Sequence, residues 1–227
     1  MSQGLFITGA GTEVGKTLIA CALAHHLRTA KRPVKVLKPI ISGFDPDLAE
    51  TSDTALLLRA AGVKVTKAAI AEASPWRYAE PISPNMAAAR TGTPIDMDAV
   101  MNHCRAALSD DALTLIEGVG GVMAPLTDEA TVLDWMAALG LPAVVVGGSY
   151  LGAMSHTLTA VSVLIERAVP IRAVVVSESR DQPVPLAETA STIAGFMPHL
   201  PVIAVPRIAP IERPWEAIDG LGELLED

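Results

Sequence analysis

The sequence has few cysteines, few aromatic residues and no long apolar stretch, although half of its 227 residues are hydrophobic. Two cysteines, Cys21 and Cys104, are too few for a disulfide framework or a cysteine metal site, so both are expected in the core of a protein from a reducing compartment. No apolar run is long enough to cross a membrane, and no secretory leader pattern is visible. These absences favour a cytoplasmic protein.

Only 4% of the residues are aromatic, so the core must be built from alanine, valine, leucine and isoleucine. Such a core is typical of helices packed on a parallel sheet. The formal net charge is −8, and an acidic surface repels nucleic acids and anionic membranes, so neither is expected as a partner. The length predicts one domain over residues 1–227.

Residues 4–17 run from an apolar strand through a glycine-rich turn into a helix that opens with Lys16 and Thr17. Backbone N–H groups of such a turn can cradle phosphates, with Glu13, Val14 and Gly15 as the expected contacts. Lys16 adds a full positive charge, and the Thr17 hydroxyl is placed to ligate a Mg²⁺ between two phosphates. The pattern therefore predicts a P-loop that binds a nucleoside triphosphate. The alternative is a flexible turn with Lys16 as a surface charge.

Apolar runs and helical stretches alternate along the chain. The runs predicted as buried strands are Leu5–Thr8, Val34–Pro39, Leu113–Glu117, Ala143–Gly147, Ala173–Ser177 and Val202–Val205. The predicted helices are Lys16–Thr29, Asp53–Ala61, Asp96–Leu108, Thr131–Leu139, Ala153–Arg167 and Leu186–Phe196. This order predicts an α/β fold of the P-loop NTPase type, a mostly parallel sheet with helices on both faces and ligands beyond the carboxyl ends of the strands. Ser42–Ser52 and Ser74–Thr93 are polar or proline-rich and are expected to be irregular.

Three charged residues near predicted strand ends are candidate site residues. Glu117 ends a buried strand and precedes Gly118 and Gly120, which favours a Mg²⁺ ligand over a strand-end cap. Asp53 opens a helix, where it could ligate metal or only favour the helix dipole. Lys38 lies at the end of the second predicted strand, just before Pro39, and could face the same ligand as Lys16 or face solvent. For Asp53 and Lys38, position in the sequence does not decide between the functional role and the structural one.

Taken together, these motifs resemble the dethiobiotin synthetases, ATP-dependent enzymes of biotin biosynthesis, over most of the chain. The segments that carry the resemblance are Gly9–Thr17, Lys38-Pro39, Ser42-Gly43, Ser52-Asp53, Ala79–Pro81, Ser83-Pro84, Glu117-Gly118, Gly120-Gly121, Leu151-Gly152 with His156, and Val205-Pro206. The lysine–proline, glutamate–glycine and glutamate–proline–x–serine–proline pieces, in this order, are more specific than the P-loop alone.

The resemblance implies a reaction of 7,8-diaminononanoate, CO₂ or bicarbonate and ATP, with Mg²⁺, in a homodimer. One amine would capture CO₂ as a carbamate, the carbamate would attack the γ-phosphoryl group, and the second amine would close a cyclic urea. Substrate and phosphate contacts are then implied for Lys16, Lys38, Thr12 and Ser42. Magnesium ligands are implied at Thr17, Asp53 and Glu117. Further nucleotide contacts are implied at Gly118, Gly120, Ser177 and Pro206.

The chain also departs from the family pattern. Gly11 stands where the family usually has aspartate, Ser155 replaces a usual asparagine, and Ser177-Glu178 stands where Asn-Asp is usual. A hydroxyl offers fewer directed hydrogen bonds than an amide, which leaves the use of CTP or GTP open. Two other functions are kept as alternatives: a related ATP-dependent amide ligase for another carboxylate, and a partitioning-type ATPase switch. Such switches commonly carry a lysine at the position of Gly11.

Overall fold

The computed structural model describes residues 3–209 and 212–225, so the predicted domain 1–227 includes residues 1–2, 210–211 and 226–227 outside the described part. The strands are β1 (Gly4–Gly9), β2 (Val34–Leu37), β3 (Ile40–Ser42), β4 (Trp76–Tyr78), β5 (Leu113–Glu117), β6 (Ala143–Gly147), β7 (Ile171–Ser177) and β8 (Val202–Val205). The α-helices are α1 (Lys16–Thr29), α2 (Asp53–Ala60), α3 (Lys67–Ala73), α4 (Pro84–Thr91), α5 (Met97–Ala107), α6 (Val132–Leu139), α7 (Ala153–Glu166) and α8 (Leu186–Phe196). Short 3₁₀ helices cover Pro46–Thr51, Pro214–Ala217 and Gly222–Leu225.

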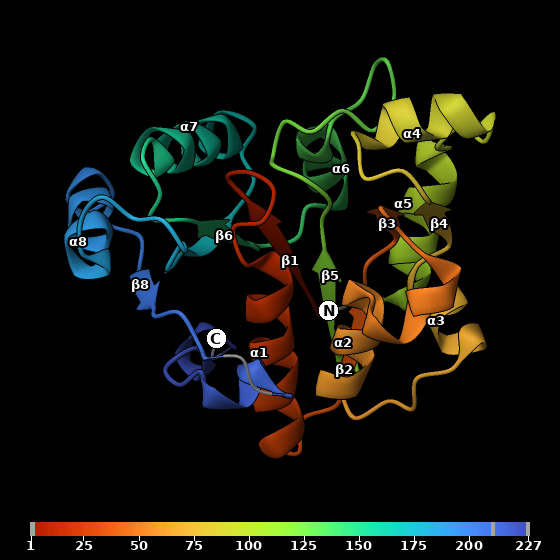
Figure 1. Ribbon diagram of the computed structural model, residues 1–227, viewed down its shortest axis with the longest axis horizontal. Helices are drawn as coiled ribbons and strands as arrows, with labels where there is room; N and C mark the ends of the chain where they lie inside the picture. Colours follow the sequence, from red (N-terminus) through yellow and green to blue (C-terminus); the bar gives the residue numbers. More distant parts are fainter. Residues whose placement is uncertain (1–2, 210–211, 226–227) are drawn as a thin grey trace.

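The main sheet has six strands in the order β2-β5-β1-β6-β7-β8, and every neighbouring pair is parallel. This arrangement confirms the predicted parallel α/β sheet. Strands β3 and β4 pair in a separate two-stranded sheet, beside α3 and α4 in Figure 1. Because all six strands of the main sheet run the same way, their carboxyl ends meet along one edge, where ligands of such sheets bind.

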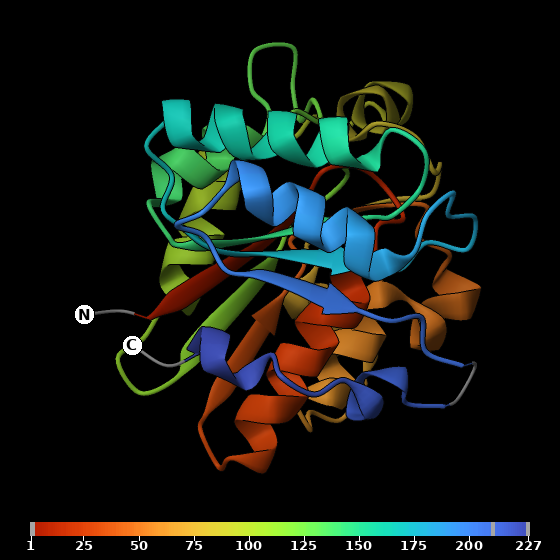
Figure 2. The ribbon, with the colours of Figure 1, turned by 90° about the vertical axis from the view of Figure 1, so that its left-hand side faces the viewer.

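Helices cover both faces of the main sheet, as predicted. In Figure 2 the sheet lies in the middle, with α7 and α8 above it and α1 below it. Helix α1 packs on α2 and on the first strands, while α7 and α8 pack on β6, β7 and β8. Parallel sheets need this cover because both of their faces are apolar.

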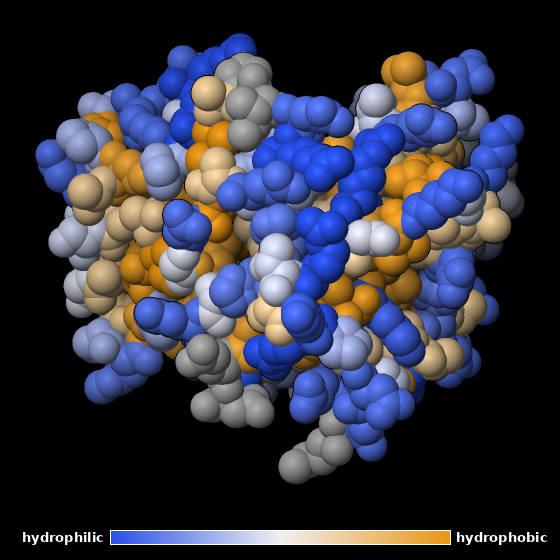
Figure 3. Space-filling view, turned by 90° about the horizontal axis from the view of Figure 1, so that it is seen from below, coloured by the Kyte–Doolittle hydropathy of each residue, from blue (hydrophilic) through white to orange (hydrophobic). Residues whose placement is uncertain are grey.

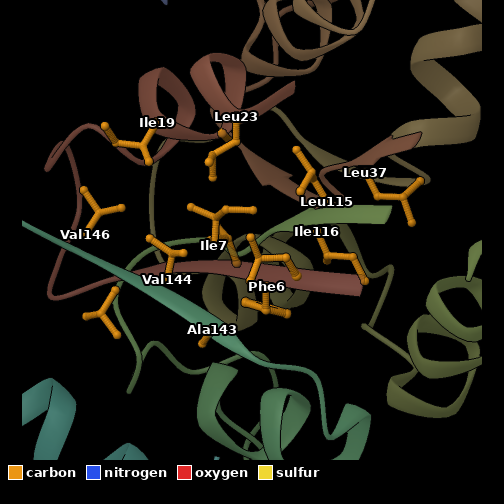
Figure 4. Close-up of a cluster of buried hydrophobic side chains, with 14 of the residues drawn as sticks. Phe6, Ile7, Ile19, Leu23, Leu37, Leu115, Ile116, Ala143, Val144 and Val146 are labelled. Carbon is orange, nitrogen blue, oxygen red and sulfur yellow. The ribbon is translucent and has the colours of Figure 1, made fainter. Parts of the chain in front are cut away.

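Neighbouring residues of β1 are buried on opposite sides of the sheet. Phe6 points to the face of α6, where its ring meets the Trp135 ring edge-on with centroids 4.9 Å apart. Ile7 points to the other face, toward Ile19 and Leu23 of α1 (Figure 4). All five side chains are at most 1% exposed, so β1 is fixed between two packed layers and holds the start of the P-loop rigidly.

The predicted elements agree with the observed ones to within two residues at most ends. Ser52 caps α2 by accepting from the Ala55 N–H, and Gly62 follows that helix with a φ of 78°. Both cysteines are buried, as expected from the sequence.

Three predictions of local structure were wrong. The segment Ser42–Ser52 contains a 3₁₀ helix, and Ser74–Thr93 contains β4 and α4, although both were expected to be irregular. Proline misled the second prediction: Pro84 starts α4 at the first helical position, where its fixed φ is compatible with a helix. The strand predicted over Val34–Pro39 ends at Leu37, and the chain then enters β3 of the small sheet.

The P-loop lies in the upper half of the molecule in Figure 1, above α1, and Figure 3 looks at the molecule from below. Hydrophilic side chains form a band across that face, with apolar ones on either side (Figure 3). Within residues 3–209 and 212–225, none of the helices combines the length and the apolar character required of a membrane span.

Candidate active site

The phosphate turn, residues 10–15, is shaped by its backbone conformation and lies between β1 and the start of α1. Gly15 has a φ of 95° and forms the N-cap of α1 without a side-chain hydrogen bond, which leaves the first N–H groups of the helix for a ligand. Glu13 has a φ of 59°, which is unusual for a residue with a side chain. The Ala10 N–H donates to the Val146 carbonyl of β6, so the turn starts from a fixed point.

A second glycine segment, after β5, packs against this turn. A Cβ on Gly121 would lie 3.3 Å from the backbone nitrogen and Cα of Gly11, so the two segments approach closely and a side chain at position 121 would require a small shift of the turn. Gly120 has a φ of 63° and lines the adjacent cavity. Gly118 lies deeper, with its N–H donating to the Ile7 carbonyl.

Two cavities lie on either side of the phosphate turn. The first, of about 720 Å³, is walled by the turn and by residues from β3, α2, the segment Pro81–Pro84 and the end of β5. The second, of about 830 Å³, is walled by the turn, Tyr150, residues 177–181 after β7, and Arg207–Ala209. Thr12, Glu13, Gly15 and Leu18 line both. A ligand lying along the turn could therefore extend into both spaces.

Four charged side chains and one hydroxyl meet in the first cavity. The Lys38 Nζ donates to Asp53 Oδ2 at 2.5 Å and to Glu117 Oε1 at 2.6 Å. The Thr17 hydroxyl donates to the same Glu117 oxygen at 2.7 Å. The Lys16 Nζ donates to the Gly11 carbonyl at 2.7 Å. The ion pairs formed among residues 3–209 and 212–225 are centred on Lys38 at this site, and none of them involves Lys16. Two lysines and two carboxylates thus surround the P-loop helix start.

Burial acts differently on the two lysines. It lowers the pKa of Lys16 to about 8, with opposing contributions from Glu117 and Asp53 and a further lowering by Lys38. Burial alone would also lower the pKa of Lys38, but the charges and hydrogen bonds of Glu117 and Asp53 outweigh it, and the pKa of Lys38 is raised. Lys38 therefore remains an ammonium throughout the physiological range, while Lys16 titrates just above neutral pH.

The residues around Glu117 have the chemistry of a magnesium site. The Glu117 side chain is 1% exposed, and its buried Oε2 has no hydrogen-bond partner in the part of the chain that the structure describes. A buried carboxylate oxygen of this kind fits a cation ligand. Among the described residues no group of three or more His, Cys, Asp or Glu side chains could hold a metal alone. Two carboxylates and a hydroxyl match Mg²⁺, which usually completes its shell with phosphates and waters.

Comparison with known proteins identifies the family. A family model described as an AAA domain matches residues 3–214. The ATP-dependent dethiobiotin synthetase BioD of Methylobacterium nodulans is 49% identical over 197 residues, which cover 84% of this chain and 87% of that protein. The BioD protein of Caulobacter vibrioides is 47% identical over 207 residues, 90% of this chain and 93% of the relative. The chain belongs to the dethiobiotin synthetase family.

A solved structure supports the fold independently. The septum site-determining protein MinD, complexed with Mg-ADP, from Pyrococcus horikoshii superimposes with a TM-score of 0.56 at 14% identity, covering 91% of this chain and 82% of that chain. At this identity the likeness establishes the fold of P-loop ATPases and nothing about partners or cargo. Membership of the dethiobiotin synthetase family, at far higher identity, distinguishes the chain from the partitioning-type switch considered above.

Most of the residues that the synthetase resemblance implies meet around the turn. The first cavity is lined by Thr12, Glu13, Gly15, Lys16, Thr17, Lys38, Ser42, Asp53, Glu117 and Gly120. The second adds Val14 and Ser177. Ser177 ends β7 directly over Gly15, whose Cβ would lie 2.7 Å from the serine Oγ. Gly118 and Pro206 line neither cavity: Gly118 packs on Phe6, and Pro206 is exposed.

Other lining residues had not been singled out from the sequence as site residues. Ile82 completes the wall of the first cavity, where the Gly43 N–H donates to the Glu80 carbonyl. Tyr150 lines the second cavity, and its hydroxyl lies 2.9 Å from His156 Nδ1. The signal was available for Ile82, because it stands within the glutamate–proline–x–serine–proline segment that carries the synthetase resemblance. The sequence gives no comparable signal for Tyr150.

Proposed function

We propose that this chain is an ATP-dependent dethiobiotin synthetase that joins 7,8-diaminononanoate and CO₂ into a cyclic urea, with release of ADP and phosphate. The observation that carries the proposal is the meeting of Lys16, Lys38, Asp53 and Glu117 beside the phosphate turn, in a chain of this family. Residues 1–227 would act as one nucleotide-binding domain, and the predicted cytoplasmic location belongs to the same proposal.

The reaction needs two anions to be held together. An amine of the substrate adds to CO₂ and loses a proton, which gives a carbamate. A carbamate oxygen attacks the γ-phosphorus of ATP and displaces ADP, forming a carbamic–phosphoric anhydride. The second amine then attacks the carbamoyl carbon, loses a proton and expels phosphate. Because carbamate and triphosphate repel each other, catalysis depends mostly on positioning and on positive charge at the transferred group.

The residues of the first cavity suit these tasks. Lys16 follows the turn and is expected to contact the β- and γ-phosphates, while Lys38 is expected to contact the carbamate and the transferred phosphoryl group. Thr12 and Ser42 line the cavity as hydroxyl-bearing contacts for substrate and phosphates. Glu13 is exposed at the same rim, where its carboxylate can accept a hydrogen bond from an amine of the diamine.

A magnesium ion fits the oxygens of Thr17, Asp53 and Glu117. When bound, Mg²⁺ would supply positive charge to the phosphate oxygens. The three residues come from α1, α2 and β5, so the P-loop and a neighbouring strand would both hold it. The orphaned Glu117 Oε2 supports this assignment, because burial without a partner is unfavourable for a carboxylate.

The nucleotide base is assigned to the second cavity. Phosphates on the turn would lie against the N–H groups of Glu13, Val14 and Gly15, and the base would extend toward Ser177. Gly120 lines the first cavity, so it is proposed to contact the phosphates of the nucleotide. Gly118 and Pro206, implied by the family pattern, would act through the backbone of the segments they begin or end.

A homodimer is part of the proposal. Three exposed apolar side chains are close in sequence to residues that line the two cavities. Leu151, next to Tyr150, is 85% exposed, and Met86 and Met123, near Pro84 and Ala124, are each 56% exposed. Contact with a second copy would remove these side chains from water. Analytical ultracentrifugation is expected to give twice the chain mass, and Leu151→Glu is expected to shift the protein to monomer. A wild-type monomer would refute the dimer.

One incubation tests the function. Purified protein is mixed with 7,8-diaminononanoate, bicarbonate, Mg²⁺ and ATP, and product mass and phosphate release are followed together. We expect dethiobiotin and phosphate in equal amounts, and neither when the diamine is omitted. Phosphate release that is independent of the diamine, without a product of dethiobiotin mass, would contradict the synthetase and favour a switch. Product formed only from another carboxylate and an amine would favour the amide ligase.

A further inference from the structure

Lys38 occupies the point at which a cation would touch both acidic residues of the site. Its Nζ lies 2.5 Å from Asp53 Oδ2 and 2.6 Å from Glu117 Oε1, and the side chain is 6% exposed. The Glu117 Oε1 also accepts from the Thr17 hydroxyl at 2.7 Å. The ammonium therefore binds two of the three proposed magnesium ligands and shares an acceptor with the third.

We infer that Lys38 and the divalent cation exclude each other at Asp53 and Glu117, so that the metal enters with the nucleotide while Lys38 moves onto the reacting phosphoryl group. The inference rests on the proposed function for its metal ligands, and it adds a positioning role for Lys38. In the structure the lysine holds the two carboxylates together through both of its ion pairs. In the loaded protein the same ammonium is delivered to the reaction.

Charge balance is the physical reason for the exchange. Lys16 and Lys38 formally neutralise Asp53 and Glu117, so the cluster has no excess negative charge to attract a divalent cation alone. Lys38 holds Glu117 Oε1, so a divalent cation on the unpartnered Oε2 of the same carboxylate would still lie within a few ångströms of the ammonium. The two cations would repel each other there, with little water to screen them. A nucleoside triphosphate brings the missing negative charge, which can accept both the cation and the released ammonium.

The cavity gives Lys38 a place to go. Its side chain lines the same 720 Å³ space as Thr12, Gly15 and Ser42, where the transferred phosphoryl group and the substrate are proposed to lie. A lysine has a flexible stem, so its ammonium can move while its Cα stays fixed after β2. Lys16 differs, because its Nζ donates to the Gly11 carbonyl and blocks neither carboxylate.

Manganese(II) binding to the nucleotide-free protein tests the inference, with the free ion measured by electron paramagnetic resonance. Lys38→Met is expected to bind Mn²⁺ at least about tenfold more tightly than wild type. Lys16→Met is the matched control: it also removes one positive charge near Glu117 but frees no carboxylate, and its Mn²⁺ affinity is expected to rise by less than about threefold. If Mn²⁺ affinity rose equally in both variants, the loss of one positive charge would explain the change, and the proposed exchange would be overturned.

A failure of the metal site itself would look different. If Mn²⁺ with ATP binds wild type tightly and Glu117→Gln weakly, the proposed ligands hold, and unchanged Mn²⁺ binding in Lys38→Met then refutes only the exchange. If Glu117→Gln binds Mn²⁺ with ATP as wild type does, the ligand assignment fails and the exchange fails with it. Thermal unfolding curves establish that each variant is folded before titration.

Crystals of the wild-type protein give a second measurement that needs no variant. Soaking with MnCl₂ alone is expected to leave Lys38 on Asp53 and Glu117, with no manganese anomalous peak between them. Soaking with MnCl₂ and a non-hydrolysable ATP analogue is expected to show manganese beside both carboxylates and the Lys38 Nζ turned to the γ-phosphate. Manganese at both carboxylates while Lys38 retains both contacts would overturn the inference.

Discussion

Lys38 and Glu117 are 79 residues apart in the sequence, yet they form a buried ion pair with 2.6 Å between Nζ and Oε1. The register of the sheet explains this pair. Strand β2 lies parallel to β5 with Leu37 opposite Ile116, so the next residue of each chain is Lys38 and Glu117. The pairing of β2 with β5 therefore brings Lys38 and Glu117 together, and the conformation of the loops matters less for this contact.

Removing either lysine tests the charge cluster. Lys16→Ala and Lys38→Ala are each expected to lower dethiobiotin formation by at least about 10²-fold, because each removes a preorganised positive charge from the phosphoryl group. Initial rates and circular dichroism spectra are compared. Lys35→Ala, on the exposed side of β2, is the matched control and should stay within about twofold of wild type. Retained turnover in both cavity variants would refute the assignment.

Glu117→Gln tests the metal ligands. The amide keeps the shape of the side chain but loses its charge, so half-maximal activity is expected to need about tenfold or more Mg²⁺. The measurement is a Mg²⁺ titration of the initial rate at saturating ATP. Glu166→Gln, at the exposed end of α7, is expected to give the wild-type curve. A wild-type Mg²⁺ requirement in Glu117→Gln would contradict the role of this carboxylate.

ADP binding is expected to weaken above pH 8. The pKa of Lys16 is lowered to about 8 by burial, and bound phosphates favour its protonated form. The contribution of Lys16 is therefore full below pH 8 and is lost as the pH rises through that value. The raised pKa of Lys38 keeps that residue charged over the same window.

Calorimetric titration with ADP at several pH values between about 7 and 9.5 measures this change, with up to a tenfold loss of affinity per pH unit above the pKa. Lys16→Met should bind weakly at every pH and show a flatter profile. A wild-type affinity that is constant across the range would argue against a Lys16 proton at the phosphates.

Ser177→Asn tests how the base is selected. Ser177 ends β7 above Gly15 and lines the second cavity, where its hydroxyl offers one rotatable donor and fewer directed hydrogen bonds than an amide. Wild type is expected to use ATP, CTP and GTP with rates within about tenfold. An asparagine amide can donate to and accept from adenine, so the variant is expected to favour ATP by about tenfold more. Ser162→Asn, on the surface of α7, is the control, and an unchanged ranking in Ser177→Asn would exclude base reading at this position.

The sequence was sufficient to predict the sheet and the meeting of charges at its edge. Parallel strands bring their ends together, so a P-loop after β1 and a glutamate at the end of β5 had to be neighbours. The sequence could not decide between ligand and solvent for Lys38 and Asp53, because the contacts that fix Lys38 come from Asp53 and Glu117, residues far from it in the sequence. The small β3–β4 sheet was missed because three-residue strands beside prolines have no periodicity to read.

The position of the phosphate turn between two cavities has a consequence for how such enzymes can diversify. Thr12, Glu13 and Gly15 border both spaces, while the residues around Ser177 border only one, and those around Glu117 only the other. Mutations that change the base preference would therefore lie in the second cavity, which the phosphate turn separates from the proposed reaction site in the first. An energy donor can be exchanged over evolutionary time, or by design, while the ring-forming machinery stays as it is.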